Sequence, residues 1–368
     1  MSLSMRDRFV REGEPGVNEV SPSRTKMLDY DLVLLGIIGA ILVLGLIMVY
    51  SSSIAITEGP SNSIFRFNRY FMMQAIFIAV GFFGMFTVFN INMDKWEELS
   101  PYVYIAAVIF LVLVLIPFIG REVNGARRWI PLGPVNFQPT ELAKMAIVLY
   151  TARYAVRNRH GIGNFSWSEG LVRGVLPIVA LLVILAYLSY LEPDLGAAMV
   201  IASICIGILF LGGLHSFYLI GATSAAIAFV SFAVFTKPWR LKRMTAFLDP
   251  FSEEYAQSSG YQLVHSLIAI GRGEWTGVGL GFSVEKLHYL PEAHTDFILA
   301  VIGEELGFVG ILTVVALYFV LVFKCFKIGR VAIAMDRFFS GLVAQGVGIW
   351  IGFQALFNLC VCLGLLPT

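Results

Sequence analysis

Residues 290–307, LPEAHTDFILAVIGEELG, place a histidine, an aspartate and two glutamates at the start of a long apolar run. Ionisable side chains are costly at membrane depth and are usually kept there for function. Asp296 stands where polar chain meets apolar chain, so a carboxylate that is part wet and part shielded could have a raised pKa and act as a general base. Capping of a helix N-terminus by Thr295 or Asp296 is an equally good interpretation, and one residue can do both.

The stretch WRLKRM, residues 239–244, carries the cations that such chemistry could use. On a helix, Arg240 and Arg243 share one face at i, i+3, with Trp239 at the start. Guanidinium groups bind phosphates bidentately, and tryptophan favours the membrane interface. A clamp for a lipid phosphate or diphosphate is the functional interpretation of this stretch, although the stretch by itself favours the alternative. The alternative is a surface that contacts headgroups, which is the commoner use of interfacial basic residues.

Further charges occur in the segment REVNGARRWIPLGPVNFQPTELAK, residues 121–144. Arg127 and Arg128 are adjacent, so their side chains point in different directions. Glu141 and Lys144 stand at i, i+3 on the helix that follows, close enough to pair. An ion pair at membrane depth faces protein or a wet cavity. It either holds helices in register or belongs to a site, and the sequence leaves both interpretations open.

The turn LEPDLG adds two carboxylates, Glu192 and Asp194, although Pro193 and Gly196 already account for a turn. A base and several cations that share one membrane surface fit group transfer from a lipid-linked diphosphate. The attacking hydroxyl must lose a proton, and the departing diphosphate must be stabilised by cations or a divalent metal. The charged residues expected at this surface are Arg127, Arg128, Glu141, Lys144, Glu192, Asp194, Arg240, Arg243 and Asp296, with His265, His288 and His294.

Composition indicates an all-α, polytopic membrane protein, because 58% of residues are hydrophobic and only 14% are charged. The net charge of +1 implies no attraction to nucleic acid, and the four cysteines lack metal-ligand spacing. The segment 297–323 is too long for a simple crossing, so its first residues could form a lead-in or a kinked turn. Nine spans are predicted, namely 32–50, 70–89, 102–119, 141–156, 175–190, 195–211, 217–235, 297–323 and 339–363.

Basic residues in the short loops fix the expected orientation. Arg153, Arg157, Arg159 and Arg173 share one loop, and Lys324, Lys327, Arg330 and Arg337 share another. Both loops then lie with the polar N-terminus, residues 1–31, in the cytoplasm. The long segment 237–295 is extracytoplasmic and has internal structure, including a short apolar helix over 261–270 on or in the outer leaflet.

Several ordered motifs resemble the SEDS proteins over the chain from its first span to its end. They are RRWI and QPTELAK within 127–144, EPDLG at 192–196, RMTAFLDPF at 243–251, HTDFI at 294–298 and GEELG at 303–307. The polar N-terminus and SLIAIGRGEWTGVGLG are closer to the FtsW-like branch, which serves division, than to the RodA-like branch, which serves elongation and cell shape.

The resemblance implies a peptidoglycan glycosyltransferase of the bacterial inner membrane that polymerises lipid II on its periplasmic face. It implies that Asp296 is the catalytic residue, and that Glu141 and Lys144 lie in a central cavity near it. It also implies a class B penicillin-binding protein, a transpeptidase, as partner, together with other divisome proteins and membrane lipids. The substrate or diphosphate residues expected are Arg243, Arg240, Arg127, Lys144 and Glu141, and the supporting residues are His294, Glu192, Asp194 and Gln262.

Family members usually have ten spans, so the last loop and helix are expected to be missing from the transmembrane domain, residues 32–368. No metal ligand set is predicted, although a divalent cation could assist the diphosphate. Two other classes of protein stay open. A flippase for lipid-linked precursor would also need a polar cavity, but repeats or broken helices at mid-membrane would be expected. A scaffold would need no outer carboxylate.

Overall fold

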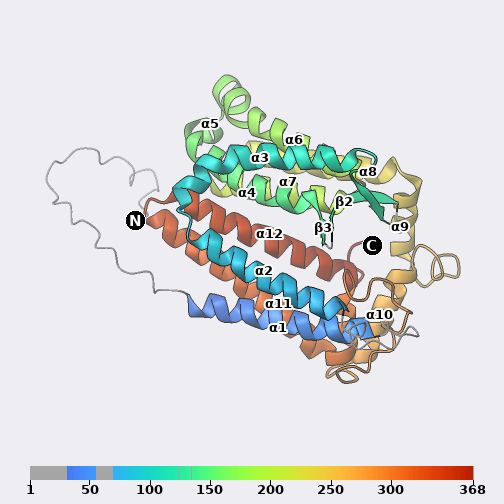
Figure 1. Ribbon diagram of the computed structural model, residues 1–368. Helices are drawn as coiled ribbons and strands as arrows, with labels where there is room; N and C mark the ends of the chain where they lie inside the picture. Colours follow the sequence, from blue (N-terminus) through green and yellow to red (C-terminus); the bar gives the residue numbers. More distant parts are fainter. Residues whose placement is uncertain (1–30, 55–68, 124, 134, 368) are drawn as a thin grey trace, which may run out of the picture.

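The computed structural model describes residues 31–54, 69–123, 125–133 and 135–367. The predicted cytoplasmic N-terminus therefore lies almost wholly outside the described residues. The long helices lie side by side in one bundle (Figure 1). Each of the nine predicted spans overlaps a long helix among the described residues, with bounds that differ most for α3 and α11. These helices are α1 (Leu32–Ser53), α2 (Arg69–Phe89), α3 (Met93–Leu115), α4 (Pro139–Arg157), α6 (Leu176–Leu191), α7 (Leu195–Leu211), α8 (Ser216–Phe235), α11 (Ile298–Ala334) and α12 (Phe338–Cys362).

Seven helical stretches within the described residues are long and apolar enough to cross a membrane. They include α1, α2, α3, α8, α11 and α12, and a stretch in which the π-helix η3 (Trp167–Val175) runs into α6. The helix α7 is apolar but shorter. The helix α4 carries two charged residues at each end, which lowers its hydropathy. The fold is thus an all-α, multi-pass membrane bundle, and the number of crossings stays a prediction.

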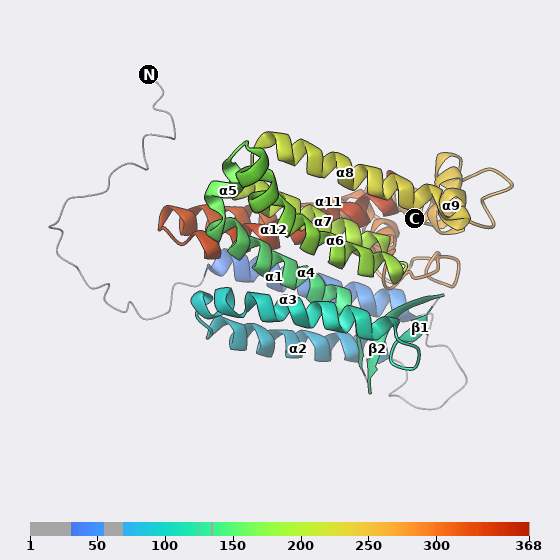
Figure 2. The same ribbon diagram turned by 90° about the horizontal axis from the view of Figure 1, so that it is seen from above.

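The core of the bundle is built around α4. This helix packs against α3, α7 and α12, and its buried face is rich in alanine, which allows close approach of the neighbouring helices. In Figure 2, α2 and α8 lie at opposite edges of the bundle. No described residue of α2 is buried, and α8 exposes large apolar side chains such as Ile227 and Phe232. Such surfaces suit contact with lipid.

The helix α11 is broken at Gly307, which has φ of 67° and ψ of −164°. The eighth span therefore begins with a short helical lead-in that ends in a kink, which combines the two alternatives predicted for it. A Cβ at Gly307 would lie 2.4 Å from the main-chain N of Gly277, so only glycine allows this approach. The loop that follows α10 fills the break, because Phe308 N donates to Glu274 O at 2.9 Å and Val309 N donates to Trp275 O at 3.2 Å. The break therefore anchors the loop after α10 on a long apolar helix.

Two expectations need correction. The segment 121–137, for which no strands were predicted, contains β1 (Arg121–Val123), β2 (Ala126–Leu132) and β3 (Val135–Phe137), which form an antiparallel sheet in the order β1-β2-β3. The Asn-Gly pair at 124–125 is a hairpin signal that the sequence analysis did not use, and Gly125 has φ of 75°. In addition, α11 continues to Ala334 and α4 to Arg157, so Lys324, Lys327 and Arg330 of the one predicted loop, and Arg153 and Arg157 of the other, belong to helices.

The two ends of the bundle can be told apart by their contacts. The start of α1 and the middle of α11 meet at one end, where Lys324 Nζ lies 2.8 Å from Asp31 Oδ2. The short helix α5 (Arg159–Gly163) lies at this end too (Figure 1). The sheet, α9 (Pro238–Leu248) and α10 (Tyr261–Gly273) lie at the other end, which we call the Asp296 end. Helices α9 and α10 give the segment 237–295 the internal structure predicted for it.

Candidate functional site

Asp296 lies immediately before α11, and its main chain is held by α12. Its carbonyl oxygen accepts a hydrogen bond from Asn358 Nδ2 at 2.9 Å and one from Cys362 Sγ at 3.5 Å. The N-cap residue of α11 is Phe297, without a side-chain cap, so neither Thr295 nor Asp296 caps the helix through its side chain. The Asp296 side chain is exposed. The carboxylate therefore takes no part in capping the helix, while the main chain of Asp296 is fixed by α12.

The pKa of Asp296 is raised from its ordinary value. The main cause is lost hydration, because protein surrounds the exposed carboxylate on its other sides, and the charge of Glu292 adds to the effect. Asp194 raises the pKa too, whereas Arg128 and His294 lower it. A carboxylate whose pKa lies closer to neutrality is a better general base at physiological pH.

Arg128, on β2, stands at the centre of this cluster. Its Nε donates to Glu192 O at 3.1 Å, and its Nη2 donates to Pro193 O. Its charge acts on Asp296, Glu192 and Arg243, so it lies within electrostatic range of all three. The sequence analysis placed Arg128 at this surface without a role of its own.

Arg127, the neighbour of Arg128, forms an ion pair at 3.2 Å with Glu122 of β1, and both side chains are largely exposed. Adjacent residues of a strand point to opposite faces. The structure therefore engages Arg127 within the sheet and turns Arg128 towards the loop between α6 and α7.

Glu192 is fully buried, and neither of its carboxylate oxygens has a hydrogen-bond partner among the described residues. Burial raises the pKa of Glu192 to about 8, Asp194 adds to the shift, and Arg128 opposes it. Glu192 is therefore largely protonated at neutral pH. Asp194 instead caps α7 through Ala197 N at 3.0 Å and accepts a hydrogen bond from Gln138 Nε2 at 3.3 Å.

Glu192→Gln is expected to flatten the pH dependence of stability. The pKa of Glu192 is higher in the folded protein than in the unfolded chain, where it is about 4.3. The folded protein therefore loses stability as the pH rises from the unfolded pKa to the folded pKa. The melting temperature of the wild type should fall more steeply between pH 5 and pH 8 than that of Glu192→Gln, because the amide does not ionise. The measurement is thermal unfolding in detergent at several pH values. If the melting temperatures of the wild type and Glu192→Gln changed with pH in parallel, Glu192 would not be a buried, protonated acid.

The stretch around Trp239 forms α9, as predicted. Arg240 is buried, donates from Nη1 to Ala233 O at 2.9 Å, and lies 4.9 Å from the Trp239 ring and 5.0 Å from the Tyr190 ring. These contacts tie α9 to α8 and α6. Arg243 is exposed and lies 5.4 Å from the Trp239 ring. Crowding by protein lowers its pKa, and the like charge of Arg128 lowers it further.

Lys144 is buried and forms a 2.7 Å ion pair with the half-exposed Glu141, as the i, i+3 spacing predicts. Its Nζ also donates to Gln354 Oε1 at 3.1 Å. Gln354 stands one turn before Asn358 on α12, the residue that holds Asp296. The pair thus connects to Asp296 through one face of α12. Gln354 and Asn358 were not predicted from the sequence, although two amides at i, i+4 in an apolar span are a usable signal.

Glu304 and Glu305, two buried glutamates at the break in α11, have a structural role that was not predicted from the sequence. Glu304 accepts hydrogen bonds from Val284 N at 2.9 Å and Arg272 Nη1 at 3.2 Å, and also from Ser283 Oγ and Glu285 N. Glu305 lies 2.6 Å from Lys286 Nζ and 2.7 Å from Ser51 Oγ. These contacts dock the segment 283–286 onto α11 and α1. The docked segment precedes Asp296, so the cluster positions the chain that carries the carboxylate.

The remaining predicted residues, His294 and Gln262, lie on the same end. The His294 ring lies 4.7 Å from the Tyr70 ring, and its buried Nδ1 has no partner among the described residues. Gln262 lines a pocket together with Arg243. Among the described residues, no three or more His, Cys, Asp or Glu side chains lie together so that they could hold a metal ion.

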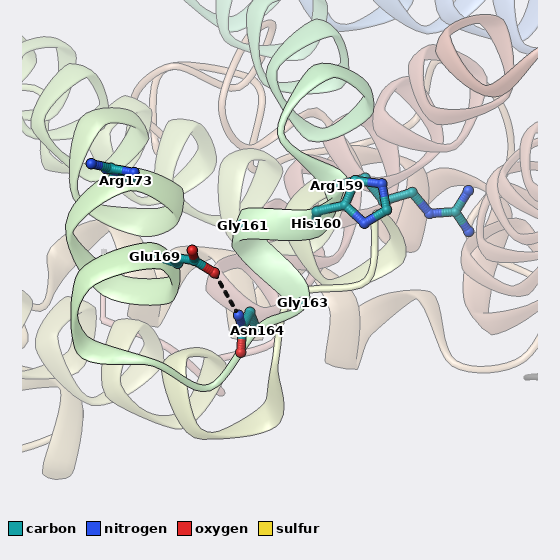
Figure 3. Close-up of a pocket in the computed structure, with 7 residues that line it drawn as sticks. All are labelled: Arg159, His160, Gly161, Gly163, Asn164, Glu169 and Arg173. Atoms are coloured by element: carbon teal, nitrogen blue, oxygen red, sulfur yellow. Dashed lines mark hydrogen bonds between the residues drawn. The ribbon is translucent and has the colours of Figure 1, made fainter.

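A second pocket, of about 680 Å³, lies at the opposite end, around α5 and η3. Its charged groups do not converge. Figure 3 shows Glu169 bonded to Asn164, at 3.1 Å, and Arg159 directed away from Glu169. The Arg159 guanidinium lies 4.9 Å from the Phe338 ring of α12. At the Asp296 end, by contrast, the charge of Arg128 acts on both the Asp296 carboxylate and the Arg243 guanidinium, so this end is the better candidate site.

Comparisons with known proteins agree with this architecture. Residues 32–368 match the sequence profile of the FtsW, RodA and SpoVE family, described as cell cycle protein. A Burkholderia thailandensis protein is 49% identical over 96% of this chain and 75% of its own, and a Taylorella equigenitalis protein is 52% identical over 88% and 87%. Both are named "Probable peptidoglycan glycosyltransferase FtsW".

Solved structures give the same result. A chain of a peptidoglycan synthase complex, studied for polymerisation and crosslinking, superposes with a TM-score of 0.69 at 28% identity, covering 93% of this chain and 90% of its own. The rod shape determining protein RodA of Thermus thermophilus gives a TM-score of 0.61 at 25% identity, covering 91% and 86%. The chain belongs to the FtsW, RodA and SpoVE family of multi-pass membrane proteins. Within that family it is FtsW-like, as its relatives' names indicate.

Proposed function

We propose that this chain is a peptidoglycan glycosyltransferase that polymerises lipid II during cell division, with Asp296 as its general base. The observation that carries the proposal is a backbone-anchored, exposed carboxylate with a raised pKa, within electrostatic range of Arg128. Arg128 in turn acts on Arg243. The names of the FtsW relatives support the substrate class.

In the proposed reaction, Asp296 accepts the proton of the 4-hydroxyl of the acceptor N-acetylglucosamine. The oxygen attacks the anomeric carbon of the donor N-acetylmuramic acid as the bond to undecaprenyl diphosphate breaks. An α-linked donor gives a β-linked product by a single inversion, so no covalent sugar–enzyme intermediate is required. The proton ends on Asp296 and the electron pair on the diphosphate.

The departing diphosphate gains negative charge, which we expect Arg243 and Arg128 to stabilise. The donors of Arg128 rest on main-chain carbonyls rather than on a carboxylate, so its positive charge is not neutralised by these contacts. Two guanidinium groups that repel one another favour an anion between them. Arg240 and Arg127 were predicted for the same role, and their contacts with Ala233 and Glu122 make them weaker candidates.

The proposed setting is the bacterial inner membrane, with the N-terminus in the cytoplasm and the Asp296 end in the periplasm. A class B penicillin-binding protein is the proposed partner, because the new strand must be crosslinked. Support comes from a structural relative that belongs to a peptidoglycan synthase complex. In this setting the polyprenyl tails of both substrates stay in the lipid beside the helix bundle.

The test is polymerisation of lipid II by the purified chain and its transpeptidase partner in detergent, read as glycan strands on a gel. Detergent leaves no membrane to cross, so a flippase would give no product there. Strands should form with the wild type. An absence of strands with active partner and intact lipid II would refute the proposal.

Arg243→Ala is expected to lower the polymerisation rate by about 100-fold, because one donor to the leaving group is lost. Arg157→Ala is the matched control, since Arg157 lies on the opposite end and pairs with Glu97 at 3.4 Å. An exposed ion pair of this kind contributes little to stability, so the control should keep its rate. Equal rates for the two variants in the gel assay would remove Arg243 from the mechanism.

A further inference from the structure

A pocket of about 500 Å³ opens beside Arg243 at the Asp296 end of the bundle. Its walls come from α9, the loop after it, the start of α10 and Pro291, which precedes Asp296 closely in the chain. The volume falls within the range of about 300–1,000 Å³ that is typical of small-molecule sites. The lining residues are Arg243, Gln257, Ser258, Ser259, Tyr261, Gln262 and Pro291.

The lining carries one charged group, and its other polar groups are neutral. Within the described chain, the side chains of Gln257, Ser259 and Gln262 make no hydrogen bond to protein, whereas Ser258 Oγ donates to Glu254 O at 2.9 Å. Amides and hydroxyls both donate and accept, which matches the hydroxyl and N-acetyl groups of a sugar. A single guanidinium at one edge matches one anionic group. A peptide with several carboxylates would need more cations.

The wall formed by α10 is fixed before any ligand binds. The Tyr261 ring lies 4.2 Å from the His265 ring, and His265 Nδ1 lies 2.6 Å from Glu285 Oε2. Glu285 belongs to the segment that Glu304 docks onto α11. The loop is ordered by main-chain bonds as well, such as Gly260 N to Tyr255 O at 2.9 Å. A site held in this way binds without a large ordering cost.

We propose that this pocket is the donor subsite and binds the sugar that is attached to the diphosphate. This inference rests on the proposed function, and it assigns the donor, one of the two substrates, to the pocket beside Arg243. The diphosphate lies by Arg243, on the side of Arg128, and the sugar hydroxyl and N-acetyl groups bond to Gln257, Ser259 and Gln262. The acceptor sugar then binds outside this pocket, with its 4-hydroxyl at Asp296.

The experiment separates donor from acceptor with two probes. Lipid II whose N-acetylglucosamine 4-hydroxyl is capped with galactose can act only as donor, and a short glycan strand without diphosphate can act only as acceptor. Gln262→Ala is expected to raise the KM for the capped lipid about tenfold, which is the loss of about one hydrogen bond. The KM for the acceptor strand should not change. Ser252→Ala is the matched control for Ser259→Ala, because Ser252 Oγ bonds to Asp249 O at 3.0 Å and lies outside the pocket.

A raised KM for the acceptor strand alone would make the pocket an acceptor subsite and overturn the assignment. Unchanged KM values for both probes in Gln262→Ala and Ser259→Ala would show that the pocket binds no sugar. Failure of the wild type to join the two probes would refute the proposed function instead. Binding of the capped lipid to wild type and Gln262→Ala, measured directly in detergent, still tests the pocket in that case.

Discussion

Asp296→Asn is expected to lower the rate of glycan polymerisation by about 10³-fold, with the binding of lipid II retained. The amide has the same shape but cannot accept the proton, and general-base catalysis contributes about 10²–10⁴-fold. The backbone contacts from Asn358 and Cys362 to the carbonyl of residue 296 do not involve the side chain, so the fold should be kept. The measurement is the initial rate with lipid II, together with its binding constant.

Glu253→Gln provides the matched control for this prediction. Glu253 is an exposed carboxylate in the loop after α9, outside the lining of the pocket beside Arg243. It should keep the wild-type rate. A variant of Asp296 that kept more than about one tenth of the rate would show that another group takes the proton.

Glu305→Ala is expected to destabilise the protein by about 3–5 kcal/mol and to abolish activity. The substitution leaves Lys286 buried and unpaired, which costs far more than loss of an exposed pair. The segment 283–286 should then leave α11, and Asp296 should lose its fixed position. Thermal unfolding of the purified protein gives the stability, and the lipid II assay gives the activity.

The double variant Glu305→Leu with Lys286→Met distinguishes loss of the ion pair from loss of packing. Because both charges are removed, much of the stability should return. Ser51 Oγ loses its acceptor in both cases, so that part of the cost is shared. A single variant as stable as the wild type would contradict the burial of the pair. A double variant no better than the single one would mean that packing, not charge, dominates.

Local sequence signals predicted much of the scaffold around the site. Composition and the length of the apolar runs predicted the helices. The excess length of the eighth span indicated a lead-in or a kinked turn at its start, and the break lies at Gly307. The i, i+3 spacing of Glu141 and Lys144 gave their ion pair. These features depend on neighbours within one or two helical turns, so a single sequence can indicate them.

Features that depend on distant partners were not predictable in this way. Ser51 and Glu305 are 254 residues apart, and no local pattern pairs them. The central place of Arg128 depends on carbonyls 64 and 65 residues away, which only the packing of β2 against the loop after α6 supplies. The contact of Asn358 with Asp296 joins α12 to the start of α11 across 62 residues.

The pH dependence of kcat/KM for lipid II polymerisation tests the role of Asp296 most directly. In a plot of kcat/KM against pH, the fall at low pH gives the pKa of the essential base in the free enzyme. For the wild type, kcat/KM is expected to fall as pH is lowered through a pKa above the ordinary aspartate value of about 3.9. The residual activity of Asp296→Asn should show no such acidic limb. The same limb in both proteins would contradict proton transfer to this carboxylate.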